Sequence, residues 1–291
     1  MTILVTAASG RLGRLVVESL LARGATPAEI VASARDTSKL TDVAARGIRT
    51  VELDYARPDT IAPALEGVDA VLLISGSEPG NRAALHQNVI DAARAAGVAK
   101  LVYTSAPRAT TADFVLAPDH KATEEAIAAA GVPAVIVRNN WYTENYAADV
   151  ARAASTGVIT SSAADGRVAS AARADYADGA AAVLLEDGHL GQVYEFGGDV
   201  TWSYDELAAA ASALVGREVV YQPLTTEAHV AALEAAGLDA GTAGFVAAID
   251  TGIREGVLAH TDGTLSRIIG RPTTPLVEGL RAAVEVEDAA A

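Results

Sequence analysis

The segment best suited to chemistry is Val5-Thr6-Ala7-Ala8-Ser9-Gly10-Arg11-Leu12-Gly13, which follows an apolar run and opens an amphipathic one. Its glycines therefore lie where a strand turns into a helix. Gly10 lets the backbone approach a pyrophosphate closely, Gly13 lets the helix pack against the strand, and the helix N-terminus offers N–H groups to the anion. We expect the phosphates of a dinucleotide to rest on the backbone between Thr6 and Gly13.

An alanine stands at the first position of this GxxGxxG pattern, where a glycine is usual. If the backbone at Ala7 takes a positive φ, the alanine is strained there by on the order of 1 kcal/mol. The loop is then expected to differ slightly from the usual shape. The competing interpretation is a tight turn with no ligand, which the strand before it and the helix after it disfavour.

The end of the second expected strand indicates which dinucleotide binds. That strand ends in Ser33-Ala34-Arg35-Asp36, with Lys39 one turn further on. An acid at this place holds the 2′-hydroxyl of the adenine ribose, whereas an arginine accepts a 2′-phosphate. Arg35 favours NADP(H), as NADPH in the reductive direction. The alternative makes Asp36 the ribose ligand and Arg35 a surface charge, and spacing does not separate two adjacent residues.

Composition limits the class of protein. The chain has 291 residues, of which 51% are hydrophobic, 20% charged and 4% aromatic, so Ala, Val, Leu and Ile must build the core. The absence of cysteine excludes disulfides, thiolate metal sites and Cys nucleophiles. A net charge of −15 makes nucleic acid a poor partner. No run reaches the length of a membrane span. We expect a soluble cytoplasmic protein, monomeric or homodimeric, with no metal and no membrane partner.

Short β-like runs alternate with helical patterns through the first half of the chain, which predicts right-handed crossovers and a parallel sheet. The expected strands are 3–6, 30–34, 48–53, 70–75, 100–105 and 134–138, with helices at 11–22, 81–96 and 120–130. Gly97 and Gly131 read as helix C-caps. Ligands bind beyond the carboxyl ends of such strands, including the segment from Ser75 to Ser77. The cofactor-binding candidates are Thr6, Ala8, Ser9, Gly10, Arg11, Leu12, Arg35, Lys39, Asp54, Ser75, Gly76, Thr104, Ser105 and Asn139.

The alternation of strands and helices becomes irregular after about residue 155, although a helix at 173–187 and a strand at 192–196 still fit the alternation of the first half. Ser203 and Glu206 form a capping box for a further helix. The predicted architecture is α/β, a Rossmann-like doubly wound parallel sheet with a smaller α/β C-terminal lobe. We place the nucleotide-binding domain at 1–155, with about 170–198 returning to it, and a mainly helical substrate lobe at 199–291.

These motifs resemble those of the NmrA-like atypical short-chain dehydrogenases, a group that includes type 2 NAD(P)H:quinone oxidoreductases and triphenylmethane reductases. Besides the glycine loop, the matching segments are LEGVDAVLLIS at 65–75, AARAAGVAKLVYTS at 92–105, HKATEEAIAAAGVPAVIVRNNWYTENY at 120–146, TWSYDELA at 201–208 and IIGRPTTPL at 268–276. The resemblance runs from end to end. It implies a Rossmann domain and a small substrate lobe, and either reduction of quinones or cationic dyes with NADPH or cofactor sensing without turnover.

The Tyr-x-x-x-Lys dyad of typical family dehydrogenases is missing. Anchoring on Glu124 puts His120 at the lysine position and Leu116 at the tyrosine position, and Lys121 is one residue out of phase. Reducing a ketone creates an alkoxide that needs a proton donor. Reducing a quinone creates a far more stable phenolate, and reducing a triarylmethyl cation creates no anion. The missing dyad therefore favours a reductase of quinones, dyes or other electron-poor conjugated molecules, and an NADP(H)-sensing regulatory protein is the alternative.

The catalytic candidates are His120 and Tyr142. His120 is suited to orienting the nicotinamide ribose or donating a proton, or else it is a helix-surface histidine paired with Glu124. Asn140, Trp141 and Tyr142 follow the sixth strand and are the substrate candidates, because flat substrates need flat contacts. The competing interpretation is packing for the two aromatics and a common strand-end residue for the asparagine.

Overall fold

The computed structural model of the chain describes residues 1–76 and 80–288. Within that part the chain divides into two compact units. The first comprises the described residues of Met1–Thr110, together with Leu116–Asn139 and Arg173–Glu195. The second comprises Thr111–Val115, Asn140–Ala172 and the described residues from Phe196 onward. The domain division expected from the sequence, at residues 155 and 199, stays a prediction.

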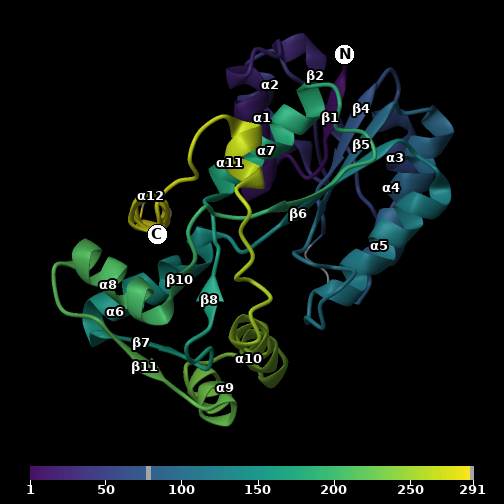
Figure 1. Cartoon of the computed structure of the whole chain (residues 1–291). Helices are drawn as coiled ribbons and strands as arrows, with labels where there is room; N and C mark the ends of the chain where they lie inside the picture. The colour runs from purple at the N-terminus through teal and green to yellow at the C-terminus, as the bar shows by residue number, and fades with distance from the viewer. Residues whose placement is uncertain (77–79, 289–291) are drawn as a thin grey trace. The chain divides into compact units, whose positions relative to one another are not determined.

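The first unit is built on a seven-stranded sheet in the order β3-β2-β1-β4-β5-β6-β9 (Figure 1). Neighbours from β3 through β6 pair in parallel, which confirms the predicted Rossmann-like architecture. The strands are β1 (Ile3–Val5), β2 (Ile30–Ala34), β3 (Arg49–Glu52), β4 (Ala70–Leu73), β5 (Lys100–Ser105), β6 (Ala134–Asn139) and β9 (Val193–Phe196). Four of them, β1, β2, β4 and β5, are buried along their whole length, because helices cover both faces of the sheet.

Two groups of helices cover the sheet of the first unit (Figure 1). On one face α1 packs against α7, and on the other α4 packs against both α3 and α5. These helices are α1 (Arg11–Ala22), α2 (Thr41–Ala44), α3 (Pro58–Ala64), α4 (Arg82–Ala96), α5 (Ala117–Ala130) and α7 (Arg173–Leu185), with the short helices η1 (Pro27–Glu29) and η2 (Thr37–Leu40) beside β2. Gly97 and Gly131 adopt left-handed conformations with φ of 69° and 67°, which confirms both predicted C-caps.

The strand order reverses between β1 and β4, since β2 and β3 extend the sheet on one side of β1 and β4 to β6 on the other. Loops leaving the carboxyl ends of neighbouring strands diverge at such a reversal and leave a crevice. The glycine loop leaves β1 at this point. The topology therefore places the predicted phosphate loop where a doubly wound sheet binds its ligand.

The second unit contains more strand than the sequence suggested. Two small sheets pair β7 (Val158–Ser161) with β11 (Val220–Pro223) in parallel and β8 (Arg167–Val168) with β10 (Trp202–Ser203) in antiparallel fashion. The helices are η3 (Thr143–Tyr146), α6 (Ala147–Thr156), α8 (Tyr204–Val215), α9 (Thr226–Ala235), α10 (Ala240–Arg254), α11 (Thr264–Ile269) and α12 (Leu276–Asp288). The capping box predicted at Ser203 and Glu206 is present at the start of α8.

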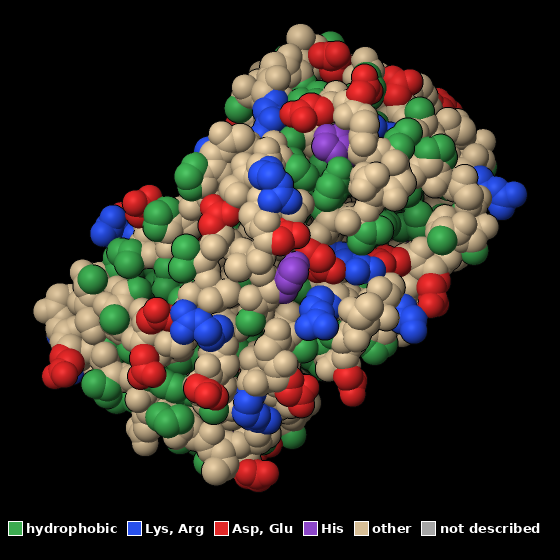
Figure 2. Space-filling view, viewed as in Figure 1, with side chains coloured by type: hydrophobic (Ala, Val, Ile, Leu, Met, Phe, Trp, Pro, Cys, Tyr) green, Lys and Arg blue, Asp and Glu red, His purple; other side chains and the backbone are tan. Residues whose placement is uncertain are grey.

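The surface carries the acidic excess of the sequence. Acidic side chains number 37 and basic ones 22. On the face drawn in Figure 2, Lys and Arg side chains stand singly or in small groups among Asp and Glu side chains. Across residues 1–76 and 80–288 no helix combines the length and the apolar character that crossing a bilayer requires. A cytoplasmic location stays a prediction.

Candidate functional site

A cavity of about 410 Å³ opens in the first unit beside the glycine loop. Eight predicted cofactor-binding residues line it, namely Ser9, Gly10, Arg11, Leu12, Arg35, Asp54, Ser75 and Gly76. They come from the carboxyl ends of β1, β2, β3 and β4, because parallel strands present those ends at one edge of the sheet. Ser75 and Gly76 belong to the loop after β4, which ends at Leu73, and Ser77 lies outside the described residues.

The glycine loop has the backbone of an anion-binding site. Gly10 is the N-cap of α1, makes no side-chain cap and accepts a hydrogen bond from the Arg14 N–H at 3.0 Å. The N–H groups of the first turn consequently have no partner within the helix, and that turn holds no acidic residue. Such N–H groups, together with the helix dipole, favour a phosphate group.

Close packing in the loop explains why position 13 is a glycine. A Cβ built there would lie 2.4 Å from the carbonyl oxygen of Ala7 and 2.7 Å from the Cα of Ala8. Ala7 itself has a φ of +47°. The backbone strain predicted for an alanine with a positive φ therefore applies. The strain costs on the order of 1 kcal/mol, and the link from the Ala8 N–H to the Ser33 carbonyl at 2.7 Å helps to hold the loop in place.

The adenine-ribose corner separates the two adjacent candidates there. Asp36 is the N-cap of η2, and its carboxylate accepts hydrogen bonds from the backbone N–H and the hydroxyl of Ser38 at 3.0 and 2.7 Å. These bonds lower the pKa of Asp36, which is therefore an ionised cap. Arg35 lines the cavity and Asp36 does not, which favours the arginine as the residue that faces the ribose. Lys39 is exposed and absent from the lining, and its carbonyl accepts a hydrogen bond from Arg14 at 2.5 Å.

Three further predicted residues support the cavity from behind. The Thr6 hydroxyl accepts a hydrogen bond from the Ile74 N–H at 2.9 Å, and the Thr104 hydroxyl accepts one from the Ser75 N–H at 2.9 Å. Ala8 is fully buried. These residues fix the loops after β1 and β4, so their placement in direct contact with a cofactor stays a prediction.

Tyr55 lines the cavity and was missed by the sequence analysis. Its hydroxyl lies 2.5 Å from the Thr6 hydroxyl and donates to the Ile74 carbonyl at 2.8 Å, so it joins the loops after β1, β3 and β4. Burial raises the pKa of Tyr55, which keeps the phenol neutral. The available signal was its position directly after Asp54 at a strand tip.

A buried histidine holds the loop after β4. The Nε2 of His86 accepts a hydrogen bond from the Gly76 N–H at 3.1 Å, so Nδ1 carries the proton and donates to the Thr123 hydroxyl at 3.0 Å. Burial lowers the pKa of His86 to about 4, and the nearby Arg82 adds to this shift. The neutral ring therefore acts as a fixed link between α4, α5 and the cavity loop.

His120 is a buried residue and not a surface one. It is 5% exposed, and its Nδ1 lies 2.8 Å from the Tyr103 hydroxyl. The interpretation of His120 as a helix-surface residue paired with Glu124 is wrong. Burial is the main reason that the pKa of His120 is lowered to about 3. With this pKa the ring is a hydrogen-bonding group near pH 7, and its remaining N–H is too weak an acid to protonate a product.

Glu124 instead belongs to a buried ion-pair cluster. Its carboxylate accepts two hydrogen bonds from the Arg138 guanidinium, at 2.9 and 2.6 Å, and one from the Ser105 hydroxyl at 2.6 Å. Arg138 also donates to Glu195 at 2.9 Å. Hydrogen bonding to Glu124 raises the pKa of Arg138. Ser105, a predicted cofactor ligand, is thus engaged in tying β5 to α5.

Asn139, at the end of β6, presents an unusual feature. It is 7% exposed, and neither its amide nitrogen nor its carbonyl oxygen has a hydrogen-bond partner within the described part of the chain. Burying an amide without partners costs on the order of 1–3 kcal/mol. A bound group that supplies both a donor and an acceptor would remove this cost.

The substrate candidates of the second unit have different surroundings. The Asn140 amide donates to the Leu258 carbonyl at 3.1 Å and accepts from the Trp141 N–H at 2.7 Å, so both ends of the amide have partners within the unit. Tyr142 forms an isolated parallel bridge with Ala171. Trp141 lines a second cavity that lies wholly within this unit. The roles of these residues toward a substrate stay predictions.

The fold and the cavity together are those of an α/β protein with a cleft at the switch point of its sheet, the place where such folds bind dinucleotides. The chain belongs to the NAD(P)H-binding family, whose model matches residues 7–187, and the resemblance inferred from the motifs is confirmed. It is 44% identical to quinone oxidoreductase 2 of Escherichia coli over 96% of this chain and 97% of that protein.

Two solved structures show the same architecture. The NADPH-dependent quinone oxidoreductase of Escherichia coli, complexed with NADPH, has a TM-score of 0.93 at 43% identity, covering 97% of this chain and 99% of that one. The triphenylmethane reductase of a Citrobacter species, complexed with NADP(H), has a TM-score of 0.92 at 35% identity, covering 97% of this chain and all of the other.

Proposed function

We propose that the protein is an NADPH-dependent reductase that transfers hydride to a quinone or a similar electron-poor conjugated molecule. The observation that carries the proposal concerns His120, which its spacing from Glu124 puts at the position of the family's catalytic lysine. It is buried and hydrogen-bonded to Tyr103, and burial lowers its pKa to about 3. In addition, no tyrosine in the chain precedes a lysine by four residues.

This arrangement suits acceptors that need no proton from the protein. When bound, the nicotinamide supplies the hydride. A quinone that receives it becomes a stabilised phenolate, which can take its proton from water, whereas a ketone would become an alkoxide that requires an acid. The names of the related enzymes, a quinone reductase and a dye reductase, agree with such acceptors.

The residues of this chain have distinct tasks toward NADPH. The first-turn N–H groups of α1 would hold the pyrophosphate, and Arg35 would hold the 2′-phosphate. Asn139 offers one donor and one acceptor from a buried position, as a carboxamide of the cofactor requires. The neutral ring of His120 would orient a hydroxyl group and not protonate a product.

A fluorescence titration with NADPH and NADH, followed by NADPH oxidation measured with a panel of quinones and triarylmethane dyes, tests the proposal. We expect tighter binding of NADPH than of NADH, and turnover with at least one acceptor class. Binding of NADPH without oxidation by any acceptor would contradict the reductase.

The same result would favour the alternative, an NADP(H)-sensing regulatory protein. That alternative further requires different affinities for NADP⁺ and NADPH and a protein partner recovered by pull-down. Turnover without a partner would contradict it, so the two functions give opposite outcomes in these assays.

A further inference from the structure

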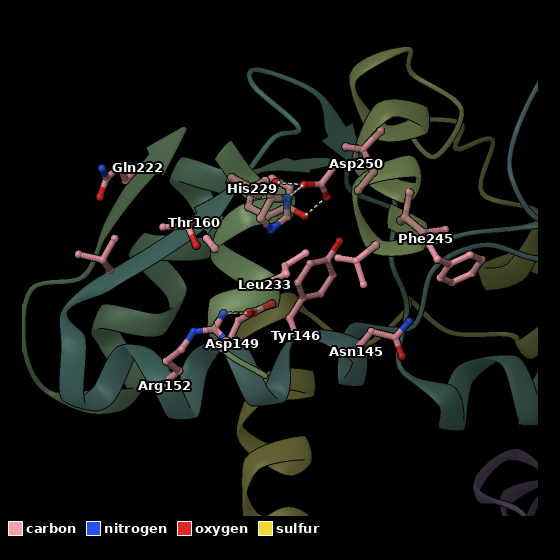
Figure 3. Close-up of a pocket in the computed structure, with 18 of the residues that line it drawn as sticks. Asn145, Tyr146, Asp149, Arg152, Thr160, Gln222, His229, Leu233, Phe245 and Asp250 are labelled. Atoms are coloured by element: carbon pink, nitrogen blue, oxygen red, sulfur yellow. Dashed lines mark hydrogen bonds and ion pairs between the residues drawn. The ribbon is translucent and has the colours of Figure 1, made fainter. Parts of the chain in front are cut away.

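A cavity of about 530 Å³ lies wholly within the second unit. Its lining comes from η3, α6, β7, α8, β11, α9 and α10 (Figure 3). The size suits a ligand of one or two fused rings, since small-molecule pockets start at about 300 Å³. No sequence motif pointed to it, because its residues are spread from 141 to 253.

A histidine is fixed at the wall of this cavity by a fully engaged carboxylate. The Nδ1 of His229 lies 2.9 Å from an oxygen of Asp250. The same carboxylate accepts hydrogen bonds from the Ser161 hydroxyl and the Ser162 N–H, each at 2.7 Å. Asp250 is therefore an ionised anchor, and these hydrogen bonds hold the pKa of its carboxyl below the usual value.

The anchor determines what His229 can offer a ligand. With Nδ1 donating to Asp250, the acceptor position of the ring is Nε2. Within the described residues Nε2 makes no hydrogen bond, although the side chain is only 7% exposed. The Ser162 hydroxyl approaches Nδ1 at 3.4 Å and not Nε2, so the three side chains do not have the arrangement of a Ser-His-Asp triad.

A second polar group of the lining also has no partner. Tyr146 is 4% exposed, and within the part of the chain that the structure describes its hydroxyl has no hydrogen-bond partner of good geometry, although the Tyr204 side chain is a polar neighbour. The ring is held edge-on by Trp202, with centroids 4.8 Å apart, so the hydroxyl is fixed in direction. Figure 3 shows this hydroxyl and the ring of His229 turned toward the same space.

The remaining surroundings indicate an uncharged aromatic ligand. Trp141, Leu233 and Ile249 are among the apolar residues of the wall. Asp149 and Arg152 of the lining pair with each other and leave little net charge there. An anion would meet the Asp250 carboxylate behind His229. The two carboxylates of the lining, Asp149 and Asp250, are already paired with Arg152 and His229, so neither is left over to neutralise a cation.

From these features we infer that the cavity of the second unit binds a neutral phenol, an aromatic ring whose hydroxyl donates to the Nε2 of His229 while a ring oxygen substituent accepts from the Tyr146 hydroxyl. A single hydroxyl that donates to His229 and accepts from Tyr146, or two separate oxygen substituents, can satisfy both side chains. The phenol gives a partner to the Tyr146 hydroxyl, which is buried and has none, and a donor to the Nε2 of His229. This inference concerns binding alone and does not depend on the proposed reductase activity.

The experiment is calorimetric titration of the full chain, without NADPH, using 2-naphthol and 2-methoxynaphthalene. The two probes share a ring system, but the methyl ether has no hydrogen to donate. We expect 2-naphthol to bind about two- to tenfold more tightly, the range that one net hydrogen bond supplies. Equal affinities, or no detectable binding of 2-naphthol, would overturn the inference.

Two substitutions locate the hydrogen bonds. His229→Asn keeps a nitrogen near the Nδ1 position for Asp250 and removes the Nε2 acceptor, so it should abolish the preference for 2-naphthol. Tyr146→Phe should weaken both probes about two- to tenfold, because each carries an oxygen that accepts. Tyr194→Phe, which removes the hydroxyl that contacts His189 at 2.8 Å in the first unit, is the matched control and should change neither affinity.

The outcomes separate binding at this site from other effects. Persistence of the 2-naphthol preference in His229→Asn would place the ligand elsewhere and overturn the inference. If thermal unfolding shows that His229→Asn is not folded, two other measurements still test the inference. They are the comparison of the two probes on the unaltered protein and the titration of Tyr146→Phe. Unchanged affinities in Tyr146→Phe would also contradict the assignment.

Discussion

Replacing Gly13 with alanine tests the packing of the phosphate loop. The new Cβ would lie 2.4 Å from the Ala7 carbonyl oxygen and 2.7 Å from the Ala8 Cα, and both neighbours are backbone atoms that cannot rotate away. Forcing a methyl group into such a site costs about 1–3 kcal/mol, against a helix-propensity gain of at most about 1 kcal/mol. We expect a net loss of about 1–2 kcal/mol in the free energy of unfolding.

Because the displaced atoms belong to the loop that would hold the pyrophosphate, NADPH affinity should fall by about tenfold or more in Gly13→Ala, which corresponds to about 1.4 kcal/mol. Urea denaturation measures the first effect and fluorescence titration the second. The matched control is Gly244→Ala on an exposed turn of α10, where an added Cβ meets nothing within 4 Å, so stability should rise by up to about 1 kcal/mol. A Gly13→Ala protein as stable as the parent, with unchanged NADPH affinity, would show that the added methyl group does not disturb the loop.

Three further predictions concern single side chains of the first unit. Arg35→Ala should weaken NADPH binding about 10- to 100-fold and leave NADH binding nearly unchanged in parallel titrations, and equal losses would show that the arginine does not read the 2′-phosphate. Glu124→Gln removes one carboxylate from a buried arginine and should lower the free energy of unfolding by about 2–4 kcal/mol in urea denaturation. Lys121→Gln, which breaks an exposed ion pair of 4.0 Å, should lower it by less than about 0.5 kcal/mol. Similar losses in the two variants would contradict the buried cluster. Burial lowers the pKa of His120 from 6.5 to about 3, so the unfolded chain binds more protons between those values and stability falls as the pH drops below about 6.5. His120→Asn should therefore flatten the pH dependence of the unfolding free energy by up to about 1.4 kcal/mol per pH unit, and an unaltered slope would argue against a buried neutral ring.

The order of elements in the first unit was predictable because parallel strands have a simple signature. A strand that is buried on both faces must be apolar along its length. Two of the helices between strands end at a C-cap glycine, Gly97 and Gly131. The second unit lacks this signature. Its strands β8 and β10 have two residues each, too short for any periodicity to emerge, and tertiary packing alone makes them strands.

Local sequence also determined the phosphate loop, since the need for glycine arises from backbone contacts within a few residues of the loop. Gly10, Gly13 and the anomaly at Ala7 could all be identified in this way, and so could Arg35 at the tip of β2. The sequence likewise predicted the absence of a Tyr-x-x-x-Lys dyad from spacing alone.

Only the tertiary structure decided the states of the buried polar groups. Glu124 follows His120 by one helical turn, yet it pairs with Arg138 of a neighbouring strand while His120 turns to Tyr103. Asp250 and His229 lie 21 positions apart in the chain. The cavity that they line is also bounded by strands and helices that are further away in the sequence. Hydrogen-bond partners and desolvation depend on which elements pack together, and spacing along one element carries no record of that.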